Sequence, residues 1–380
     1  MSDLNRRLMT RKSDFGDTLM DAVATPEPGE GEVVLALDRF SLTTNNITYA
    51  AYGDAIGYWK VFPTGREDFG LMPVWGFADV AASRAPGIAV GARVFGYFPM
   101  ADTLVVQAEK ISKGGFADAA PWRKAVPDIY NRYVLCAADA NYDVALENPE
   151  ALFRPLFITS YTAVDFLREH DFFGAKQVVV SSASSKTAYG AAWCMAGDDV
   201  RLIALTGARN RAFVEGLGAY QAVHGYDEIE RLPTDVPTLY LDLAGDPELR
   251  RRVHTRFGAS LTWDCLVGST QGDAFPKDDP ELVGPKPEFF FAATCLDAHR
   301  ERGTLRAFYE RFFADQRAFF ERVIDPAAPW IRIAEHQGLD EAAKVVRALA
   351  DGVSDAAEGP WCGWCAEGQP RANLCARSIV

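Results

Sequence analysis

Positive charge is in short supply in this chain of 380 residues. Lysine and arginine together number 39, against 52 aspartates and glutamates, which leaves a formal net charge of -13 at pH 7. A broadly acidic surface repels the phosphate backbone of nucleic acids. We therefore predict no nucleic-acid partner, and any phosphate group that the protein binds must meet a local basic site.

Long hydrophobic runs are also missing. No window approaches the roughly eighteen uninterrupted apolar residues of a membrane-spanning helix, and the N-terminal sequence MSDLNRRLMTRKSDFGD lacks the apolar core of a signal peptide. The apolar fraction of 48% is nevertheless that of a globular protein, and the length suits two domains. We expect a cytoplasmic protein that does not enter a membrane.

Cysteine and histidine, the ligands that zinc prefers, are few and scattered. The chain has seven cysteines, and four of them stand alone in apolar stretches, where reduced core thiols are expected: Cys136, Cys194, Cys265 and Cys295. Cys362, Cys365 and Cys375 lie together near the C-terminus, but a zinc knuckle needs a fourth ligand, and the nearest histidine is His336. We favour a packed or frayed tail and predict no metal.

The front of the chain, from about residue 30 to 112, is typical of short strands between turns. Val33, Leu35 and Leu37 recur at every second position, the period of a half-buried strand, and Gly91 and Gly96 mark turns or bulges. Regular short strands at this spacing predict a small barrel or sandwich.

From Val178 the pattern changes to apolar strands that alternate with amphipathic helices. Each crossover helix must cover one face of a sheet, so this alternation predicts an α/β fold with a doubly wound parallel sheet. The expected strands are Val178–Ser182, Val200–Thr206, Thr238–Gly245, Ala259–Gly268 and Phe289–Cys295, and the expected helices between them include Thr187–Met195, Arg209–Leu217 and Asp246–Phe257.

The turn after the first of these strands is the candidate dinucleotide site. A helix that opens where a strand ends presents unpaired N–H groups and a positive dipole end to an anion. The turn contains Ser182, Ala183, Ser184, Ser185, Lys186 and Thr187 in place of the usual glycines. Its hydroxyls and the Lys186 ammonium can hold a pyrophosphate. A serine-rich helix cap with a solvated lysine fits the string equally well.

The end of the second strand bears on cofactor selectivity. An NAD site places a carboxylate there, whereas an NADP site places a basic residue. The chain has Thr206, Arg209 and Arg211 and no acid at this point. We therefore predict NADPH, with these three residues around its 2'-phosphate. Arginines on a solvated helix face are the alternative interpretation.

The order of these segments resembles the medium-chain dehydrogenase/reductase superfamily. The resemblance rests on a strand-rich front, LFITSYTAVDFL, SSASSKTA, TGARNRAFVEGLGA and Leu241–Gly245, and it spans nearly the whole chain. The zinc-independent, quinone-oxidoreductase-like branch is the most similar. The strings LFRPLFITSY, SSASSKTA and FFAA are also similar to an uncharacterised bacterial family of that branch, a domain of unknown function.

This resemblance implies a GroES-like β-rich catalytic domain and a Rossmann domain that meet at a cleft. The implied division is residues 1–145 for the first part of the catalytic domain, 146–300 for the Rossmann domain and 301–380 for the return to the catalytic domain. Relatives carry catalytic zinc ligands in a loop that corresponds to Ser41–Tyr49, where this chain has neither cysteine nor histidine. The cysteine cluster for structural zinc is missing as well.

The resemblance also implies site residues. Asn46 is placed like an asparagine that faces the nicotinamide, and Tyr49 or Tyr52 is a candidate proton donor. Buried tyrosines are more often core aromatics whose hydroxyl merely finds a partner. Four further positions match cofactor-facing residues of relatives: Thr159, Tyr226, Gly245 and Gly268.

The function implied is an NADPH-dependent, zinc-independent reductase that transfers hydride to an activated C=C bond of an enone, quinone or enoyl thioester. The segment Tyr58–Phe62, with Trp75 and Phe77, could line a pocket for an apolar or aromatic small molecule, and it could equally be a core or a dimer surface. A homodimer through the edge of the Rossmann sheet fits the resemblance. The alternative is a catalytically inactive NADPH-binding or scaffold protein on the same fold.

Overall fold

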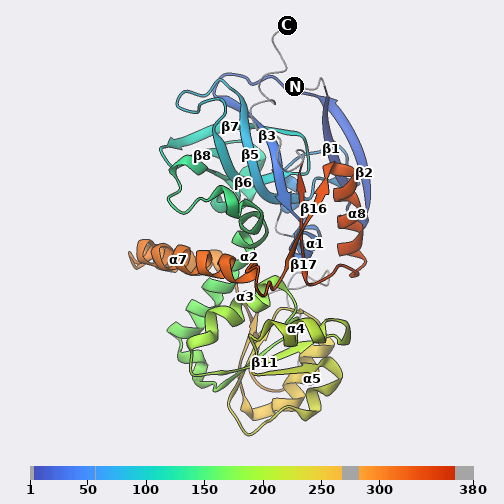
Figure 1. Ribbon diagram of the computed structural model, residues 1–380, viewed down its shortest axis with the longest axis vertical. Coiled ribbons are helices and arrows are strands. Elements are labelled where there is room, and N and C mark those ends of the chain that lie inside the picture. The colour runs from blue at the N-terminus through green and yellow to red at the C-terminus, as the bar shows by residue number, and fades with distance from the viewer. Residues whose placement is uncertain (1–3, 56, 268–281, 364–380) are drawn as a thin grey trace. The chain divides into compact units, whose positions relative to one another are not determined.

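The structure is a computed structural model that describes residues 4–55, 57–267 and 282–363. The chain folds into two compact units (Figure 1). Residues 1–152 and 333–380 form the first, here called the barrel unit, and residues 153–332 form the second, the parallel-sheet unit. The barrel unit therefore draws on both ends of the sequence.

The barrel unit is built on an eight-stranded sheet in the order β16-β17-β3-β5-β6-β9-β8-β7, which closes because β3 also pairs with β7. Its strands are β3 (Glu32–Ser41), β5 (Pro73–Ser83), β6 (Arg93–Pro99), β7 (Thr103–Ser112), β8 (Gly115–Asp118), β9 (Arg132–Leu135), β16 (Arg332–Gln337) and β17 (Glu358–Gly363). A second sheet contains the N-terminal hairpin β1 (Leu4–Arg11) and β2 (Asp14–Ala24) together with β4 (Phe69–Gly70). Closure leaves few exposed strand edges.

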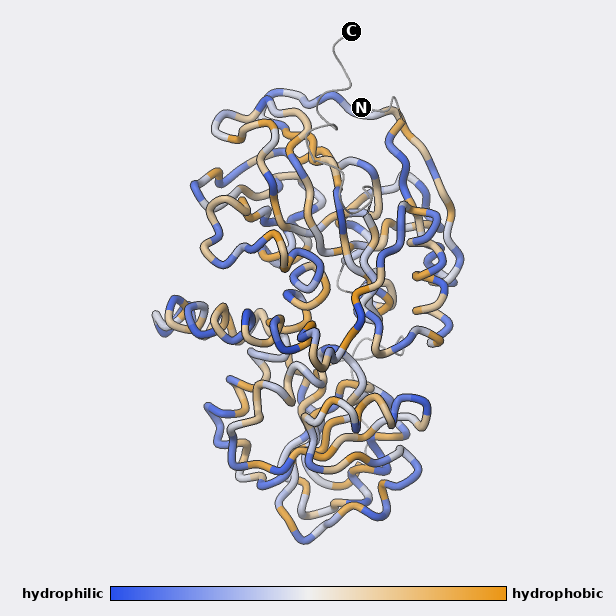
Figure 2. Tube along the Cα trace, viewed as in Figure 1, coloured by the Kyte–Doolittle hydropathy of each residue, from blue (hydrophilic) through white to orange (hydrophobic). Residues whose placement is uncertain are grey.

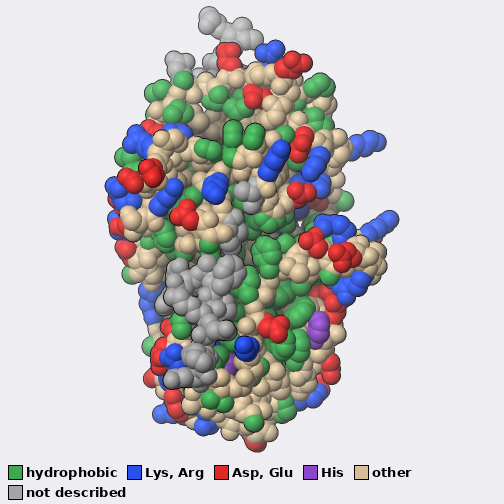
Figure 3. Space-filling view, turned by 180° about the vertical axis from the view of Figure 1, so that it is seen from behind, with side chains coloured by type: hydrophobic (Ala, Val, Ile, Leu, Met, Phe, Trp, Pro, Cys, Tyr) green, Lys and Arg blue, Asp and Glu red, His purple; other side chains and the backbone are tan. Residues whose placement is uncertain are grey.

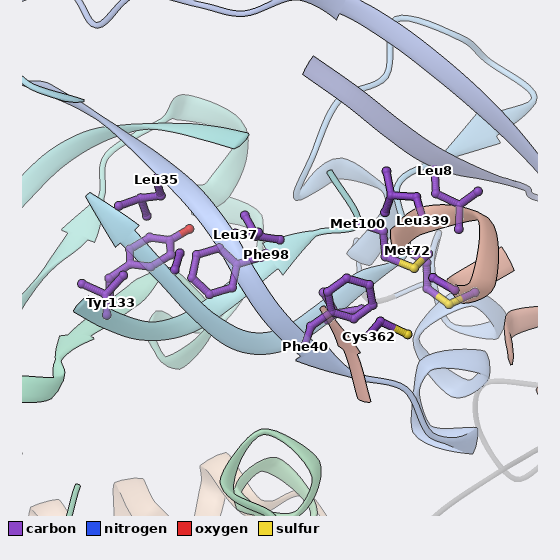
Figure 4. Packing of buried hydrophobic residues seen from close by; sticks show 14 of the residues in the cluster. Leu8, Leu35, Leu37, Phe40, Met72, Phe98, Met100, Tyr133, Leu339 and Cys362 are labelled. Atoms are coloured by element: carbon purple, nitrogen blue, oxygen red, sulfur yellow. The ribbon is translucent and has the colours of Figure 1, made fainter. Parts of the chain in front are cut away.

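The alternation in β3 sends one set of side chains into the barrel. Val33, Leu35 and Leu37 belong to a buried cluster that also takes Phe40 and Phe98, as Figure 4 shows for several members. Helices α1 (Thr44–Ala51) and α8 (Gly338–Ala350) add to this cluster through residues such as Ala50 and Leu339. Cys362 is 1% exposed in the same core, so this thiol of the tail motif is packed. Cys365 and Cys375 lie outside the described residues.

The parallel-sheet unit contains six parallel strands in the order β12-β11-β10-β13-β14-β15. The strands are β10 (Gln177–Val180), β11 (Arg201–Thr206), β12 (Ala222–Gly225), β13 (Thr238–Asp242), β14 (Leu261–Leu266) and β15 (Pro287–Phe289). Its helices are α3 (Lys186–Cys194), α4 (Arg211–Leu217), α5 (Pro247–Phe257), α6 (Ala292–Glu301), α7 (Leu305–Val323) and the larger part of α2 (Glu147–Glu169), whose first turns belong to the barrel unit. The strands are largely hydrophobic in Figure 2.

Helices cover both faces of this sheet. Val178 and Val180 pack with residues of α2 and α3, whereas Val179, between them in sequence, packs with α5. Alternate residues of a strand point to opposite faces, so both faces are buried. The predicted doubly wound parallel sheet is confirmed.

Two predicted segments differ from the structure. The aromatic run Phe289–Cys295 is not one strand, because β15 ends at Phe289 and α6 begins at Ala292, where alanines favour a helix. Residues 301–332 lie in the parallel-sheet unit rather than with the C-terminal return. These residues stay with the parallel-sheet unit because aromatic side chains of α7 pack on α2. Phe319 of α7 stacks on Phe157 of α2, with ring centroids 4.6 Å apart.

The surface carries charges of both signs. On the face shown in Figure 3, lysines and arginines are interspersed with aspartates and glutamates rather than gathered in one basic patch. Among the described residues, no helix combines the length and the hydrophobicity needed to span a bilayer.

A buried ion network ties the first turn of α2 to the barrel sheet. Glu147 is fully buried and accepts hydrogen bonds from Arg93, one of them 2.8 Å long, while Arg93 also donates to Asp38 and Asp79. Burial by itself opposes ionisation of Glu147, but the bonds from Arg93 outweigh it and hold the pKa of Glu147 below its ordinary value. The network therefore stabilises the barrel unit only while this carboxyl is ionised.

We expect Glu147→Gln to lower the free energy of unfolding of the barrel unit by about 3 kcal/mol, because the buried Arg93 guanidinium loses the carboxylate that accepts two of its bonds and keeps only Asp38 and Asp79. Glu147 has a depressed pKa in the folded state, so its stabilisation is present above the unfolded pKa and is lost as pH falls through the folded pKa. Urea unfolding at several pH values checks both points. Glu109→Gln, at an exposed site on β7, is the control, and equal effects of the two substitutions would contradict the network's role.

Candidate functional site

The serine-rich turn lies at the carboxyl end of the central strand β10. Helix α3 begins at Lys186, and its N-cap Ser185 accepts a hydrogen bond from the Ala188 N–H at 3.2 Å. Ser182 has a φ of 49°, in the left-handed region that glycine usually occupies. The turn thus makes a tight bend without a glycine, and the first N–H groups of α3 lie at the carboxyl end of β10.

A buried pair behind the turn holds its shape. Ser181 donates to the Asp242 carboxylate at 2.8 Å, and the Ser181 oxygen accepts the N–H groups of Leu243 and Ala244. Asp242 also accepts the Gly245 N–H at 3.0 Å, at a position where Gly245 has a φ of 62°. The sequence analysis did not identify Ser181 and Asp242 as the residues that hold the turn in place. An aspartate inside the apolar strand TLYLD was the available signal, because a buried carboxylate must be paired.

Two tyrosines also contact the turn. The Ser182 N–H donates to the Tyr226 hydroxyl at 3.1 Å, and the Tyr220 hydroxyl donates to the Ala183 carbonyl at 3.1 Å. Ala183 itself is fully buried. Tyr226 therefore lies beside the turn, and its hydroxyl accepts the hydrogen bond of the Ser182 N–H.

The two predicted arginines after β11 have different surroundings. Arg211 donates to Glu228 at 2.7 Å and to Glu215 at 3.0 Å, so its charge is already balanced within the helix region. Arg209 lies in the exposed turn just before α4. Thr206 is 1% exposed, and its hydroxyl finds no hydrogen-bond partner among the described residues. A buried hydroxyl without a partner is costly to the fold, and Thr206 is therefore covered by the protein itself at this strand end.

The remaining predicted cofactor residues are spread over the same unit. Thr159 lies in α2, where its hydroxyl donates to the Pro155 carbonyl at 3.4 Å. Asn210 connects the β11 turn to the serine turn by donating to Ser184 at 3.0 Å. Gly268 lies outside the described residues. Most of the predicted cofactor residues lie at or just after the carboxyl ends of neighbouring strands, and these ends form the ligand-binding edge of an open parallel sheet. They are Ser182–Thr187, Thr206, Arg209, Tyr226 and Gly245.

In the barrel unit, all three predicted catalytic residues lie in or next to α1. The stretch Ser41–Tyr49 is the end of β3 and the first part of this helix rather than a loop. Asn46 completes a capping box: its Oδ1 accepts the Thr43 N–H at 2.7 Å, and its Nδ2 donates to the Pro73 carbonyl at 2.9 Å. Asn46 therefore fixes the start of α1 and its contact with β5. Tyr52 is the buried C-cap of the helix.

Tyr49 belongs to an aromatic cluster on the outer face of the barrel sheet. Its ring lies 4.8 Å from that of Tyr58 and 5.6 Å from that of Tyr97, and its hydroxyl accepts the Trp75 indole N–H at 3.2 Å. The hydroxyls of Tyr58 and Tyr130 are 3.0 Å apart. Sequence reasoning noted the aromatic character of Tyr58 and Trp75 but missed Tyr97 and Tyr130, which come from more distant segments.

Electrostatics keep these phenols protonated. Burial, and then the neighbouring Tyr130, raise the pKa of Tyr49 well above its ordinary value, although hydrogen bonding from Trp75 and Asn45 acts in the opposite direction. Burial likewise raises the pKa of Tyr97, whose hydroxyl is fully buried and has no partner among the described residues. Because Trp75 donates to Tyr49, the proton of Tyr49 remains available to an acceptor.

Comparisons with known proteins agree with this architecture. The model of a protein family described as "Protein of unknown function (DUF2855)" matches residues 40–355. CurA from Vibrio vulnificus, solved in complex with NADPH, is 14% identical with a TM-score of 0.59, and the alignment covers 96% of this chain and 100% of CurA. No curated protein is similar enough to match the chain.

Two further solved structures share the fold. The yhdH oxidoreductase from Salmonella enterica, in complex with NADP, is 16% identical (TM-score 0.52, 95% of this chain and 100% of that chain). The quinone oxidoreductase from Coxiella burnetii is 13% identical (TM-score 0.52, with the same two coverages). These likenesses confirm the predicted fold, a GroES-like β-rich domain with a Rossmann domain.

We expect Ser181→Ala to destabilise the parallel-sheet unit by about 1 to 3 kcal/mol, because the Leu243 N–H loses its acceptor and the buried Asp242 carboxylate loses one donor. Thermal and urea unfolding measure this loss. Ser184→Ala, in the partly exposed part of the same turn, is the matched control. A loss no larger than that of the control would mean that Ser181 does not hold the turn.

Proposed function

Because the chain belongs to the DUF2855 family of proteins of unknown function, we propose its activity from its own residues. The protein is an NADPH-dependent reductase that transfers hydride to an activated C=C bond of an enone, quinone or enoyl thioester, without zinc. One observation carries this proposal. The switch point of the sheet, between β10 and β13, has a helix N-terminus with a hydroxyl-rich, lysine-bearing turn, and the end of β11, on the other side of β10, has no carboxylate.

The residues of the turn fit a pyrophosphate. Ser184, Ser185 and Thr187 offer hydroxyls, the first turn of α3 offers N–H groups, and Lys186 brings a positive charge in an acidic chain. The Ser182 N–H is engaged by Tyr226, so we assign less of the phosphate binding to that group. Tyr226 and Gly245 border the same turn and would contact the nucleotide.

Selectivity for NADPH would come from Arg209 and Thr206. Thr206 has a buried hydroxyl that lacks a partner among the residues that the structure describes, and Arg209 lies in the turn that follows it. Arg211 is held by Glu228 and Glu215, and we therefore give it a minor part in binding a 2'-phosphate. No carboxylate stands between Thr206 and Arg211 to accept from a ribose 2'-hydroxyl.

The chemistry divides between a cofactor and the protein. Bound NADPH supplies the hydride, and this chain's residues orient the acceptor and handle the proton. Tyr49 is our proposed donor, because its hydroxyl oxygen accepts the Trp75 indole N–H and its own O–H can then point toward the oxygen of a developing enolate. Asn46 holds α1, and so Tyr49, in position through its bonds to Thr43 and Pro73.

Zinc has no part in the proposed reaction. Ser41–Tyr49 offers hydroxyl, amide and phenol groups, and it has no thiol or imidazole, which zinc prefers. The aromatic cluster of Tyr49, Tyr58, Trp75 and Tyr130 favours an apolar or aromatic substrate. CurA and yhdH, which share the fold, were solved with NADPH and NADP, and this supports the choice of cofactor.

A catalytically inactive NADPH-binding protein is the second candidate. The glycine-free turn favours it, because side chains at Ser182 and Ser185 limit how closely a diphosphate can approach the backbone. The two candidates differ in turnover. Oxidation of NADPH in the presence of an enone, quinone or enoyl thioester separates them.

We expect the purified protein to bind NADPH more tightly than NADH in a calorimetric titration. Arg209→Gln should weaken NADPH binding about tenfold or more, because a charge-assisted hydrogen bond is lost, and should leave NADH binding unchanged. Arg211→Gln is the matched control and should change little. Equal affinity for the two cofactors, or a larger effect at Arg211, would contradict this assignment.

We expect Tyr49→Phe to lower kcat for C=C reduction roughly 100-fold or more, which is typical of the loss of a proton-transfer group. The Kd for NADPH should not change. Tyr309→Phe, on the partly exposed surface of α7, is the control for loss of a phenol elsewhere. A large loss with Tyr52→Phe and none with Tyr49→Phe would move the proton donor to Tyr52.

A further inference from the structure

A histidine and an aspartate form a fully buried pair inside the parallel-sheet unit. His254 lies near the end of α5, and Asp264 lies in β14. The His254 Nε2 is 2.8 Å from Asp264 Oδ2, and the His254 Nδ1 is 2.7 Å from the Val283 carbonyl oxygen. Each ring nitrogen faces an oxygen, and this fixes the orientation of the imidazole.

These two contacts need one proton more than a neutral histidine and an ionised aspartate provide. A backbone carbonyl only accepts hydrogen bonds, so the His254 Nδ1 must carry a proton to donate to Val283. A neutral imidazole has a single N–H, and its Nε2 would then turn a lone pair toward Asp264. Beside an ionised Asp264, two lone pairs would face each other at 2.8 Å. A proton between the two atoms removes this repulsion, and it belongs to the pair rather than to either residue.

A second histidine–aspartate contact in the same unit has no such need. The His299 Nε2 lies 2.9 Å from Asp165 Oδ2, but the His299 Nδ1 lies 2.8 Å from the Thr304 hydroxyl. A hydroxyl can donate as well as accept, so the His299 Nδ1 can stay unprotonated while its Nε2–H donates to Asp165. The carbonyl opposite His254 lacks this freedom.

Charged groups face the buried pair from α5 itself and from the neighbouring strand β13. Arg250, one helical turn earlier on α5, lies 3.4 Å from Asp264 Oδ2 and also donates to Asp242 of β13 at 2.6 Å. The phenol of Tyr240, also on β13, is fully buried, and burial raises its pKa so that it carries no charge. Helix α5 also packs on η9 (Tyr226–Arg231), and the ion pair between these two elements is partly exposed to solvent.

The surroundings of Asp264 favour its protonation. Its Oδ1 is buried and receives no hydrogen bond within the described parts of the chain, whereas a buried carboxylate needs donors at both oxygens. Burial raises the pKa of Asp264 and outweighs the hydrogen bond with His254, which acts in the opposite direction. A protonated Asp264 also leaves the charge of Arg250 to balance Asp242 alone.

The chain before β15 lies directly against the imidazole. Gly284 has a φ of 94°, which side chains rarely allow, and a Cβ there would lie 3.7 Å from the His254 Nδ1 and 3.4 Å from the Gly258 carbonyl oxygen. The backbone at Val283 and Gly284 is therefore held close to the end of α5, and the bond from His254 is part of that contact.

We propose that His254 and Asp264 bind one proton, and that this proton fastens the chain before β15 to α5. While it is bound, the Nδ1–H of His254 can donate to Val283. Once it leaves, the one remaining ring proton is needed at Nε2 by the fully buried carboxylate, and Nδ1 turns a lone pair toward Val283. Val283 is 54% exposed, so its contact with His254 opens first as pH rises. This pH-dependent contact does not rely on the proposed reaction.

Nitrogen-15 NMR of the histidine-labelled full chain tests where the proton lies. The chain has five histidines, and replacing each of the other four singly by glutamine identifies the His254 signals as those that remain throughout. Slightly above the ordinary histidine pKa of about 6.5, we expect His254 to keep a proton on Nδ1. Asp264→Asn should keep it there at higher pH as well, because an amide donates to Nε2 without titrating. A His254 that carries its only proton on Nε2 at this pH would overturn the proposal.

Urea unfolding at several pH values tests the link to stability. The folded pair keeps a proton that an unfolded histidine releases above about pH 6.5, so its stabilisation is lost as pH rises through the folded pKa of the pair. In the range where only the folded pair is protonated, the unfolding constant of the parent should rise about tenfold more per pH unit than that of Asp264→Asn. Asp199→Asn, whose side chain is 99% exposed, is the matched control and should follow the parent. An equal pH dependence in the parent and in Asp264→Asn would also contradict the proposal.

Discussion

The hydrogen bond between Ser181 and Asp242 is the contact on which the candidate nucleotide site depends. It joins the carboxyl ends of β10 and β13, the two strands between which the sheet reverses its order. Asp242 is fully buried, and Arg250 neutralises it through a bond of 2.6 Å. A buried carboxylate without these partners would be strongly destabilising, so the turn after β13 has little freedom to adopt another shape.

The same need to satisfy polar groups shapes the turn after β10. Ser182 takes the left-handed conformation, Ser185 caps α3 and Ser184 bonds Asn210, so each serine has a structural task. Glycine normally provides such a bend because it has no side chain to clash. Here the hydroxyls satisfy the local backbone and neighbouring side chains instead. A phosphate would then be held chiefly by the N-terminus of α3 and by side-chain donors.

The barrel unit supplies a different kind of environment. Tyr49, Tyr58, Tyr97 and Tyr130 are packed ring against ring, and burial keeps their phenols neutral. Neutral donors in an apolar setting suit the stabilisation of a developing negative charge better than solvated groups, because they need little reorganisation. Asn46 connects this cluster to the start of β5 through the Pro73 carbonyl.

The amino-acid sequence determined the architecture through its periodicities. Val33, Leu35 and Leu37 indicated a barrel strand, and the alternating apolar strands and helices from Val178 indicated a parallel sheet, because burial of one or both faces leaves few other patterns. The sequence also located the turn at Ser182–Thr187. Only the tertiary structure decided which partners these side chains have. Arg211 is neutralised by Glu228, and the Thr206 hydroxyl is buried with no partner in the described part of the chain. His299 meets Asp165, which lies 134 residues earlier in the sequence. Local patterns fix which face of an element is apolar, whereas partners distant in sequence meet only when those faces pack.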